Sequence, residues 1–145
     1  MRTQLALLLV LCGVVAAVTP ARGKATAEPT ISAFTTDHHY RIDVVAVPNP
    51  IPMATYFTLQ LAVYDGHAAV RPLSDVSIQV SVGMMHGGHE FMHGMQSSPT
   101  VEKHQGRFIV KGMMFHMQGP WTMRVRVREG TRRATADVPL QCCGR

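Results

Sequence analysis

Apolar and polar residues alternate in several stretches after about residue 40, with the period of two that is typical of half-buried β-strands. The clearest stretch begins at Trp121, where Trp121, Met123, Val125 and Val127 are separated by polar residues. Turn-forming residues, such as those of the proline-rich run 48–52, separate these stretches from one another. Strands are therefore predicted over 42–44, 57–64, 76–82, 107–111, 121–128 and 134–140.

No window of the sequence carries the period and the caps of an amphipathic helix. Six or seven short strands bounded by turns predict an all-β fold, an immunoglobulin-like or cupredoxin-like β-sandwich of about seven strands. We place this single domain at 40–141, after a polar and flexible lead-in at 24–39. The tail 142–145 holds the adjacent Cys142 and Cys143. They are either metal ligands, a vicinal disulfide or a tail without consequence.

The amino end has the composition of a secretory signal peptide. Arg2 precedes an almost uninterrupted apolar run from Leu5 to Val18, and small residues follow this run. The predicted signal covers 1–23, with cleavage possible as late as residue 27. An apolar run of about 14 residues is too short to span a bilayer, so the mature chain is expected to be periplasmic or secreted, without a membrane span.

The charge distribution excludes some classes of function. The net charge of the 145 residues is +5, and it is spread widely without interleaved aromatic residues, which does not favour nucleic-acid binding. Arg124, Arg126 and Arg128 lie on the polar side of one predicted strand. We interpret them as a solvated face, with partner docking as the alternative. No nucleophile, phosphate-binding loop or paired carboxylate stands out, so we expect no enzyme.

Methionine and histidine are concentrated in two patches. Seven of the twelve residues in 84–95 are Met or His, and a second patch covers 113–117. The first patch is rich in glycine and polar residues, which makes it poor core material. Met53 and Met123 lie outside both patches, and we expect them to fill the core.

Thioether sulfur is a soft, neutral ligand that selects Cu(I), and imidazole serves copper and zinc. In an oxidising compartment, methionine keeps its ligand atom where thiolates are lost to disulfides. The patches therefore predict an extracytoplasmic copper-binding protein that carries Cu(I), with zinc as the alternative metal. The candidate metal ligands are Met84, Met85, His86, His89, Met92, His93, Met95, Met113, His116 and Met117.

Three alternatives stay open beside a copper carrier. The methionines can serve a packing role alone, or they can form a docking surface of an accessory subunit that binds no metal. Zinc or nickel can instead be held by His86, His89 and His93. Residues 89–93 also match H-E-x-x-H, but that zinc-protease motif requires a helix, and glycines flank it on both sides. We interpret this match as accidental.

The order of these motifs resembles the YtkA-like family of exported domains, which are related to FixH-type proteins linked to copper handling and oxidase assembly. Strand 76–82 leads into Met84-Met85-His86, and Phe115-His116-Met117 is followed by Gly119 and Trp121 ahead of an alternating strand. The similar region covers about 53–140. The resemblance implies an immunoglobulin-like sandwich in which loops carrying Met and His converge at one end, with Met85, His86 and Met117 as the matching residues.

The sequence departs from that family in two places. Gly83-Met84 replaces the usual Met-Pro before the first motif, and residues 89–95 extend the loop. The number of metal ions is therefore left open by the resemblance. The implied partner is an acceptor protein such as a membrane oxidase or a copper exporter. Exported copper chaperones of the PCuAC type offer a comparable set of Met and His ligands by analogy.

Overall fold

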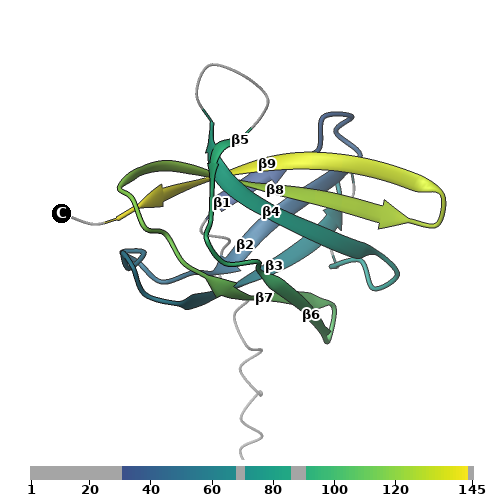
Figure 1. Ribbon diagram of the computed structural model, residues 1–145. Helices are drawn as coiled ribbons and strands as arrows, with labels where there is room; N and C mark the ends of the chain where they lie inside the picture. Colours follow the sequence, from purple (N-terminus) through teal and green to yellow (C-terminus); the bar gives the residue numbers. More distant parts are fainter. Residues whose placement is uncertain (1–30, 68–70, 86–90, 144–145) are drawn as a thin grey trace, which may run out of the picture.

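The computed structural model describes residues 31–67, 71–85 and 91–143, and these residues form strands and no helix (Figure 1). Nine strands are present in this described part, arranged in two antiparallel sheets that pack face to face. The predicted all-β sandwich is confirmed. None of the described segments is a helix long and apolar enough to cross a membrane.

The first sheet has five strands in the order β1-β2-β3-β7-β6. Their bounds are β1 Ile31–Phe34, β2 Tyr40–Ala46, β3 Phe57–Asp65, β6 Thr100–His104 and β7 Arg107–Met113. The second sheet has four strands in the order β5-β4-β8-β9. Their bounds are β4 Ser77–Met85, β5 Phe91–Gly94, β8 Gly119–Glu129 and β9 Arg132–Cys142.

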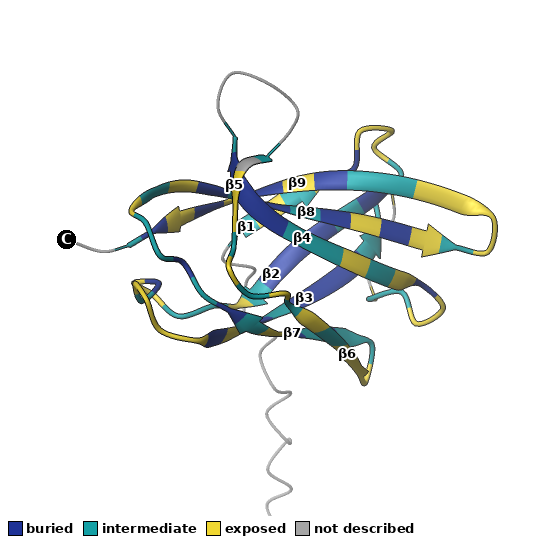
Figure 2. Ribbon diagram, in the orientation of Figure 1, coloured by how far each residue is buried: buried dark blue, intermediate teal, exposed yellow. Residues whose placement is uncertain are grey.

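The alternation in the sequence places the core between the two sheets (Figure 2). On β8 the apolar residues of the predicted pattern are at most 1% exposed, while the residues between them face outward. Tyr40, Phe108 and Phe115 add large side chains to the same core. Met123 is fully buried, as predicted, whereas Met53 is 50% exposed, so its predicted core position is wrong.

The structured domain begins earlier than the sequence predicted. Residues 31–34 form β1 and pair with β2, so the flexible lead-in predicted over 24–39 is wrong from residue 31 onward. Ser32 of β1 donates a hydrogen bond to the buried Asp43, at 2.8 Å. Thr36 of the following turn donates its backbone N–H to the carbonyl oxygen of Thr135 on β9, at 2.9 Å. The turn after β1 therefore bridges the two sheets.

The carboxyl end is also more ordered than a tail. β9 continues to Cys142, which pairs with Gly119 and is 1% exposed. Cys142 and Cys143 form a vicinal disulfide, one of the options open from the sequence. The sandwich boundary at 141 thus needs extending by at least Cys142. The predicted signal peptide and residues 24–30 lie outside the described residues.

Candidate functional site: a methionine-rich end of the sandwich

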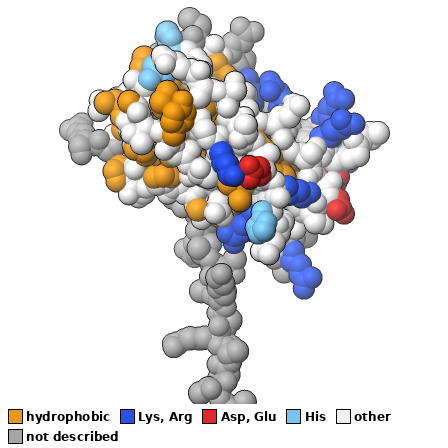
Figure 3. All heavy atoms as spheres, turned by 60° about the horizontal axis from the view of Figure 1, so that its bottom comes forward, with side chains coloured by type: hydrophobic (Ala, Val, Ile, Leu, Met, Phe, Trp, Pro, Cys, Tyr) orange, Lys and Arg blue, Asp and Glu red, His pale blue; other side chains and the backbone are white. Residues whose placement is uncertain are grey.

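The two patches of Met and His come to the same end of the sandwich. β4 ends there at Met85, and β5 pairs with it through Met84 opposite His93. Segment 114–118 connects β7 to β8, and β8 lies next to β4 with Thr122 opposite Gly83. We call this region, with the end of β9, the methionine-rich end. Figure 3 shows hydrophobic side chains gathered on one side of the molecule with histidine side chains beside them, while most of the basic side chains in view, and a further histidine, lie away from this group.

Met84 and Met113 belong to the core at this end. Met84 is 8% exposed and Met113 is fully buried. A Cβ atom at Gly119 would lie 2.9 Å from the Cε atom of Met84, so the glycine makes room for this methionine. Core packing alone explains both methionines, because they lie among apolar side chains. They are therefore weaker candidates for metal ligands than the other methionines at this end.

Met85 faces the opposite side of the sheet and contacts a cation. The Nη2 atom of Arg124 lies 3.8 Å from the Met85 Sδ atom, and the Arg124 guanidinium sits 5.1 Å from the centre of the Phe91 ring. Phe91 folds over Gly83, where a Cβ atom would meet its Cγ atom at 2.6 Å. A metal ion bound to Met85 would therefore be repelled by the positive charge of this guanidinium group unless Arg124 moved away.

His93 and Met95 lie along the other side of β5. His93 pairs with Met84 in the register and is exposed, and Met95 donates its backbone N–H to the carbonyl oxygen of Val82 at 3.3 Å. Because residues 93 and 95 are two apart on an extended chain, their side chains point the same way. The side chain of Met95 is partly buried against the core.

Segment 114–118 is held in place by Trp121. The Trp121 ring stacks on Phe115 with centroids 4.5 Å apart, and its Nε1–H donates to the carbonyl oxygen of Met117 at 2.9 Å. His116 meets the same indole edge-on, with centroids 5.5 Å apart. Met117 itself is partly buried against the core. A tryptophan fixed by the β-sandwich thus positions His116 and Met117 together.

The imidazole of His116 carries an unsatisfied atom. Its Nδ1 is shielded from solvent and has no hydrogen-bond partner among the described residues. A buried polar atom left unpaired costs about 1–3 kcal/mol, so native structures usually give it a partner. In a neutral imidazole protonated on Nε2, this Nδ1 offers a free lone pair. A soft metal ion is one partner that suits such an atom beside a thioether.

Met53 is a candidate ligand that the sequence analysis missed. It forms an isolated bridge with Phe115, and Ala54 donates its backbone N–H to the carbonyl oxygen of Phe115 at 2.7 Å. Met53 therefore lies beside the segment that holds His116, and half of its surface is open to solvent. Its position directly after Pro52 in the proline-rich run was the available signal, because such a run does not form a core strand.

Other predicted ligands are not placed. His86 and His89 lie outside the described residues, as does the side chain of Met92. His93 belongs to strand β5, and Phe91 precedes it on the same strand, so the second half of the H-E-x-x-H match is not helical. Within the described ranges, no three side chains of His, Cys, Asp or Glu come together to hold a metal ion. A metal site built from the described residues alone at this end would therefore need methionine sulfur among its ligands.

The comparisons with known proteins add no relative. No family model matches the chain, and neither a curated protein nor a solved structure is significantly similar to it. The resemblance to YtkA-like domains therefore rests on its motifs alone and stays a prediction.

Proposed function

We propose that this protein is an extracytoplasmic copper-binding domain of immunoglobulin-like or cupredoxin-like type that carries Cu(I) at its methionine-rich end. His116 and Met117 form the centre of the proposed site, with Met95, His93 and Met53 as neighbouring ligands. Met85 and His86 stay in the proposal through the resemblance to YtkA-like domains. Residues 1–23 are proposed as the export signal, which places the mature protein in the periplasm or outside the cell.

The unpaired Nδ1 atom of His116 is the observation that supports this proposal most directly. This nitrogen has no hydrogen-bond partner within the described part of the chain, and it lies in a segment that is flanked by methionines and fixed by Trp121. Neutral thioether and imidazole ligands leave the charge of the bound ion uncompensated, which favours a monovalent ion over a divalent one. The ligand chemistry therefore fits Cu(I) better than zinc.

The proposed mechanism is ligand exchange. Thioethers bind Cu(I) weakly one at a time, so an acceptor protein can replace them in steps without releasing the ion to water. Exposed ligands such as His93 and Met53 would meet the acceptor first. The ion then leaves the partly buried Met117 last. Copper is the cargo in this scheme, and the sandwich supplies a fixed frame for its ligands.

An anaerobic competition titration tests the proposal. The mature protein competes with a chromophoric chelator for Cu(I), and a parallel series uses Zn(II). We expect tight Cu(I) binding that falls by at least about tenfold in a His116→Ala, Met117→Leu double variant, because two neighbouring ligands are lost. Met123→Leu is the matched control, since this methionine is fully buried on β8. A variant pair Met85→Leu, His86→Ala measures the ligands that the resemblance supplies.

Two outcomes would overturn the copper assignment. One is a parent protein that does not compete for Cu(I). The other is a double variant that binds Cu(I) as tightly as the parent while circular dichroism shows the same fold. Tight binding of Zn(II) alone would favour a site built on His86, His89 and His93.

The exposed apolar residues favour a second candidate, a docking module that needs no metal. Met53 and Tyr56 are 50% and 67% exposed on the loop that leads into β3, at the same end. Exposed methionine surfaces adapt to varied partners, as an accessory subunit of a membrane complex would require. Association that persists unchanged in the presence of a copper chelator would favour this candidate over the carrier.

A further inference from the structure

The outer face of the second sheet carries a second feature, far along the strands from the methionine-rich end. The cross-strand register places side chains in rows across β4, β8 and β9. One row holds Arg124 opposite Asp137, and these two form a bidentate ion pair with N–O distances of 2.7 and 2.8 Å. Two residues further along, Arg126 lies opposite Thr135, and after that Arg128 lies opposite Arg133.

The row of Arg128 and Arg133 is electrostatically unfavourable by itself. Residues directly opposite on antiparallel strands have their Cα atoms about 4.5–5.5 Å apart, and like charges at such positions are destabilising. The described residues contain no salt bridge to Arg126, Arg128 or Arg133. All three side chains are exposed. The same sheet thus pairs one arginine with a carboxylate and sets two others against each other.

Nearby carboxylates are engaged elsewhere. Glu129 occupies an inward-facing position of β8, so it lies on the opposite side of the sheet from the arginine rows. There it accepts a hydrogen bond from the Tyr40 hydroxyl at 2.7 Å. Asp137 is held by Arg124. Asp75 lines a separate hollow beside Arg128, where it accepts a hydrogen bond from Ser74 at 3.2 Å. Among the residues that the structure describes, none of those lining the hollow formed by the arginine rows is acidic.

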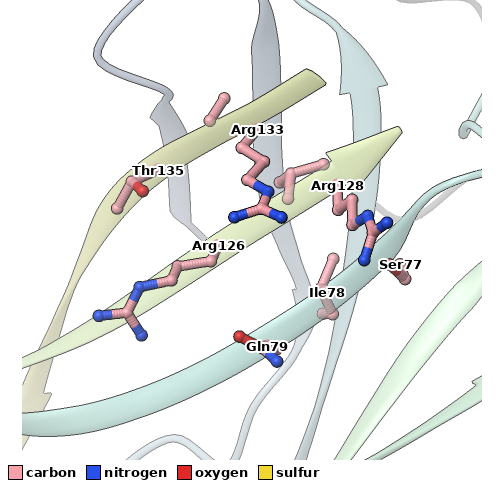
Figure 4. A pocket seen from close by; sticks show the side chains of 9 residues that line it. Ser77, Ile78, Gln79, Arg126, Arg128, Arg133 and Thr135 are labelled. Carbon is pink, nitrogen blue, oxygen red and sulfur yellow. The ribbon is translucent and has the colours of Figure 1, made fainter. Parts of the chain in front are cut away.

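This hollow has the size and the donors of a small-ligand site. It measures about 410 Å³, and Figure 4 shows Arg128 and Arg133 as neighbours among the side chains that line it, with Arg126 extending away from them. Ser77, Gln79 and Thr135 add hydroxyl and amide groups to the lining. Arg128 Nε donates to the Gly130 carbonyl oxygen at 3.2 Å, which fixes the base of its guanidinium group and leaves its terminal nitrogens free to bind.

We propose that this hollow binds a phosphate group, presented by a soluble phosphate compound or by a lipid headgroup. A phosphate group carries up to two negative charges and several acceptor oxygens, which matches two or three guanidinium forks. A single carboxylate offers one charge and two oxygens and would satisfy one arginine. The bound anion offsets the repulsion between Arg128 and Arg133. This inference does not depend on copper binding.

The test uses inorganic pyrophosphate in isothermal titration calorimetry, and vesicles of phosphatidylglycerol against vesicles of phosphatidylcholine in a sedimentation assay. Arg128→Gln with Arg133→Gln should weaken binding by at least about tenfold, because the two opposed guanidinium groups are removed. Arg132→Gln is the control: it lies on the same hairpin opposite Glu129, and it removes one charge on the other side of the sheet. Its binding should stay within about twofold of the parent.

The outcomes separate the two sources of phosphate. Binding of pyrophosphate that the double variant loses supports the site with a soluble ligand. Arginine-dependent sedimentation with phosphatidylglycerol, without pyrophosphate binding, supports the site with a lipid headgroup. Absence of both, or an equal loss in Arg132→Gln, would overturn the proposal, because the effect would then be one of net charge alone.

Discussion

The two ends of the four-stranded sheet use the same backbone for opposite chemistry. At the methionine-rich end, Phe115 and the shielded imidazole of His116 pack against Trp121, whose indole N–H holds the Met117 carbonyl oxygen. The Arg124 guanidinium beside Met85 is paired there with Asp137. At the other end, Arg126, Arg128 and Arg133 cover the outer face with like charge. We propose a soft cation as the ligand of the first end and an anion as the ligand of the second. The separation keeps a proposed cation site away from these three arginines, while Asp137 offsets the charge of Arg124 beside Met85.

The largest expected effect comes from removing the support of the methionine-rich end. Trp121→Ala deletes a fully packed indole and its hydrogen bond to Met117, and should destabilise the fold by about 3–5 kcal/mol in chemical denaturation. Trp121→Phe keeps an aromatic ring and loses the N–H donor. It should cost about 1 kcal/mol from that bond and lower Cu(I) affinity, while pyrophosphate binding stays unchanged. A Trp121→Phe protein with unaltered copper binding would show that the indole does not position the ligands.

At the opposite end, the ionisation of Tyr40 makes the stability of the fold depend on pH. Burial of Tyr40, together with its hydrogen bond to Glu129, raises the pKa of Tyr40 to about 12 from 10.0. Below pH 10 the phenol is protonated in both the folded and the unfolded state. Between pH 10 and 12 only the unfolded state loses the proton, so stability should fall by up to about 3 kcal/mol. Denaturation across this range measures the slope, and Tyr40→Phe should lack this part of it. An equal slope in Tyr40→Phe would assign the loss to other groups.

A smaller change should disturb the methionine-rich end selectively. A Cβ atom at Gly83 would lie 2.6–2.8 Å from Phe91 and from the carbonyl oxygen of His93, so Gly83→Ala should push β5 outward at a cost of about 1–3 kcal/mol. We expect weaker Cu(I) binding with unchanged pyrophosphate binding. Gly94→Ala is the matched control, since its Cβ would meet nothing closer than 3.9 Å. Equal effects of the two substitutions on stability would contradict the close packing of Phe91.

The smallest effect should be a gain in stability. Arg133→Glu converts the like-charge row into an ion pair with Arg128, similar to the pair of Arg124 and Asp137. Thermal denaturation at low salt should show stabilisation of about 0.2–1 kcal/mol, which added salt diminishes. The same change should abolish pyrophosphate binding. If Arg133→Glu destabilises the fold instead, the two arginines do not repel each other in the unliganded protein.

Long alternating stretches made most of the sandwich predictable. The segments 57–64, 76–82 and 121–128 became β3, β4 and β8 because one face of each is buried. The strands β1, β5 and β6 were missed. They are four or five residues long, too short for a period to show, and they depend on a neighbouring strand for their hydrogen bonds.

The sequence predicted where the candidate site lies, but only some of the residues that form it. One more step in the alternation of 76–82 puts Met84 inward and Met85 outward, as the structure has them. The buried position of Met113 does not follow from the alternation of apolar and polar residues alone. Gly112 has a positive φ of 76°, and the pairing of β3 with β7 shifts register there, so Met113 turns into the core. The exposure of Met53 and the unpaired Nδ1 of His116 follow from tertiary packing that a local pattern does not contain.

The turn after β1 also limits how copies of this protein can associate. Thr36 occupies the Thr135 carbonyl oxygen with both its backbone N–H and its hydroxyl group, and Pro139 leaves the same outer strand without one amide donor. A free strand edge is a template for adding a strand from another molecule, and β9 is partly capped against this. Strand β5, the opposite border of that sheet, is four residues long. At high local concentration this four-stranded sheet therefore has little tendency to grow by adding strands from other copies.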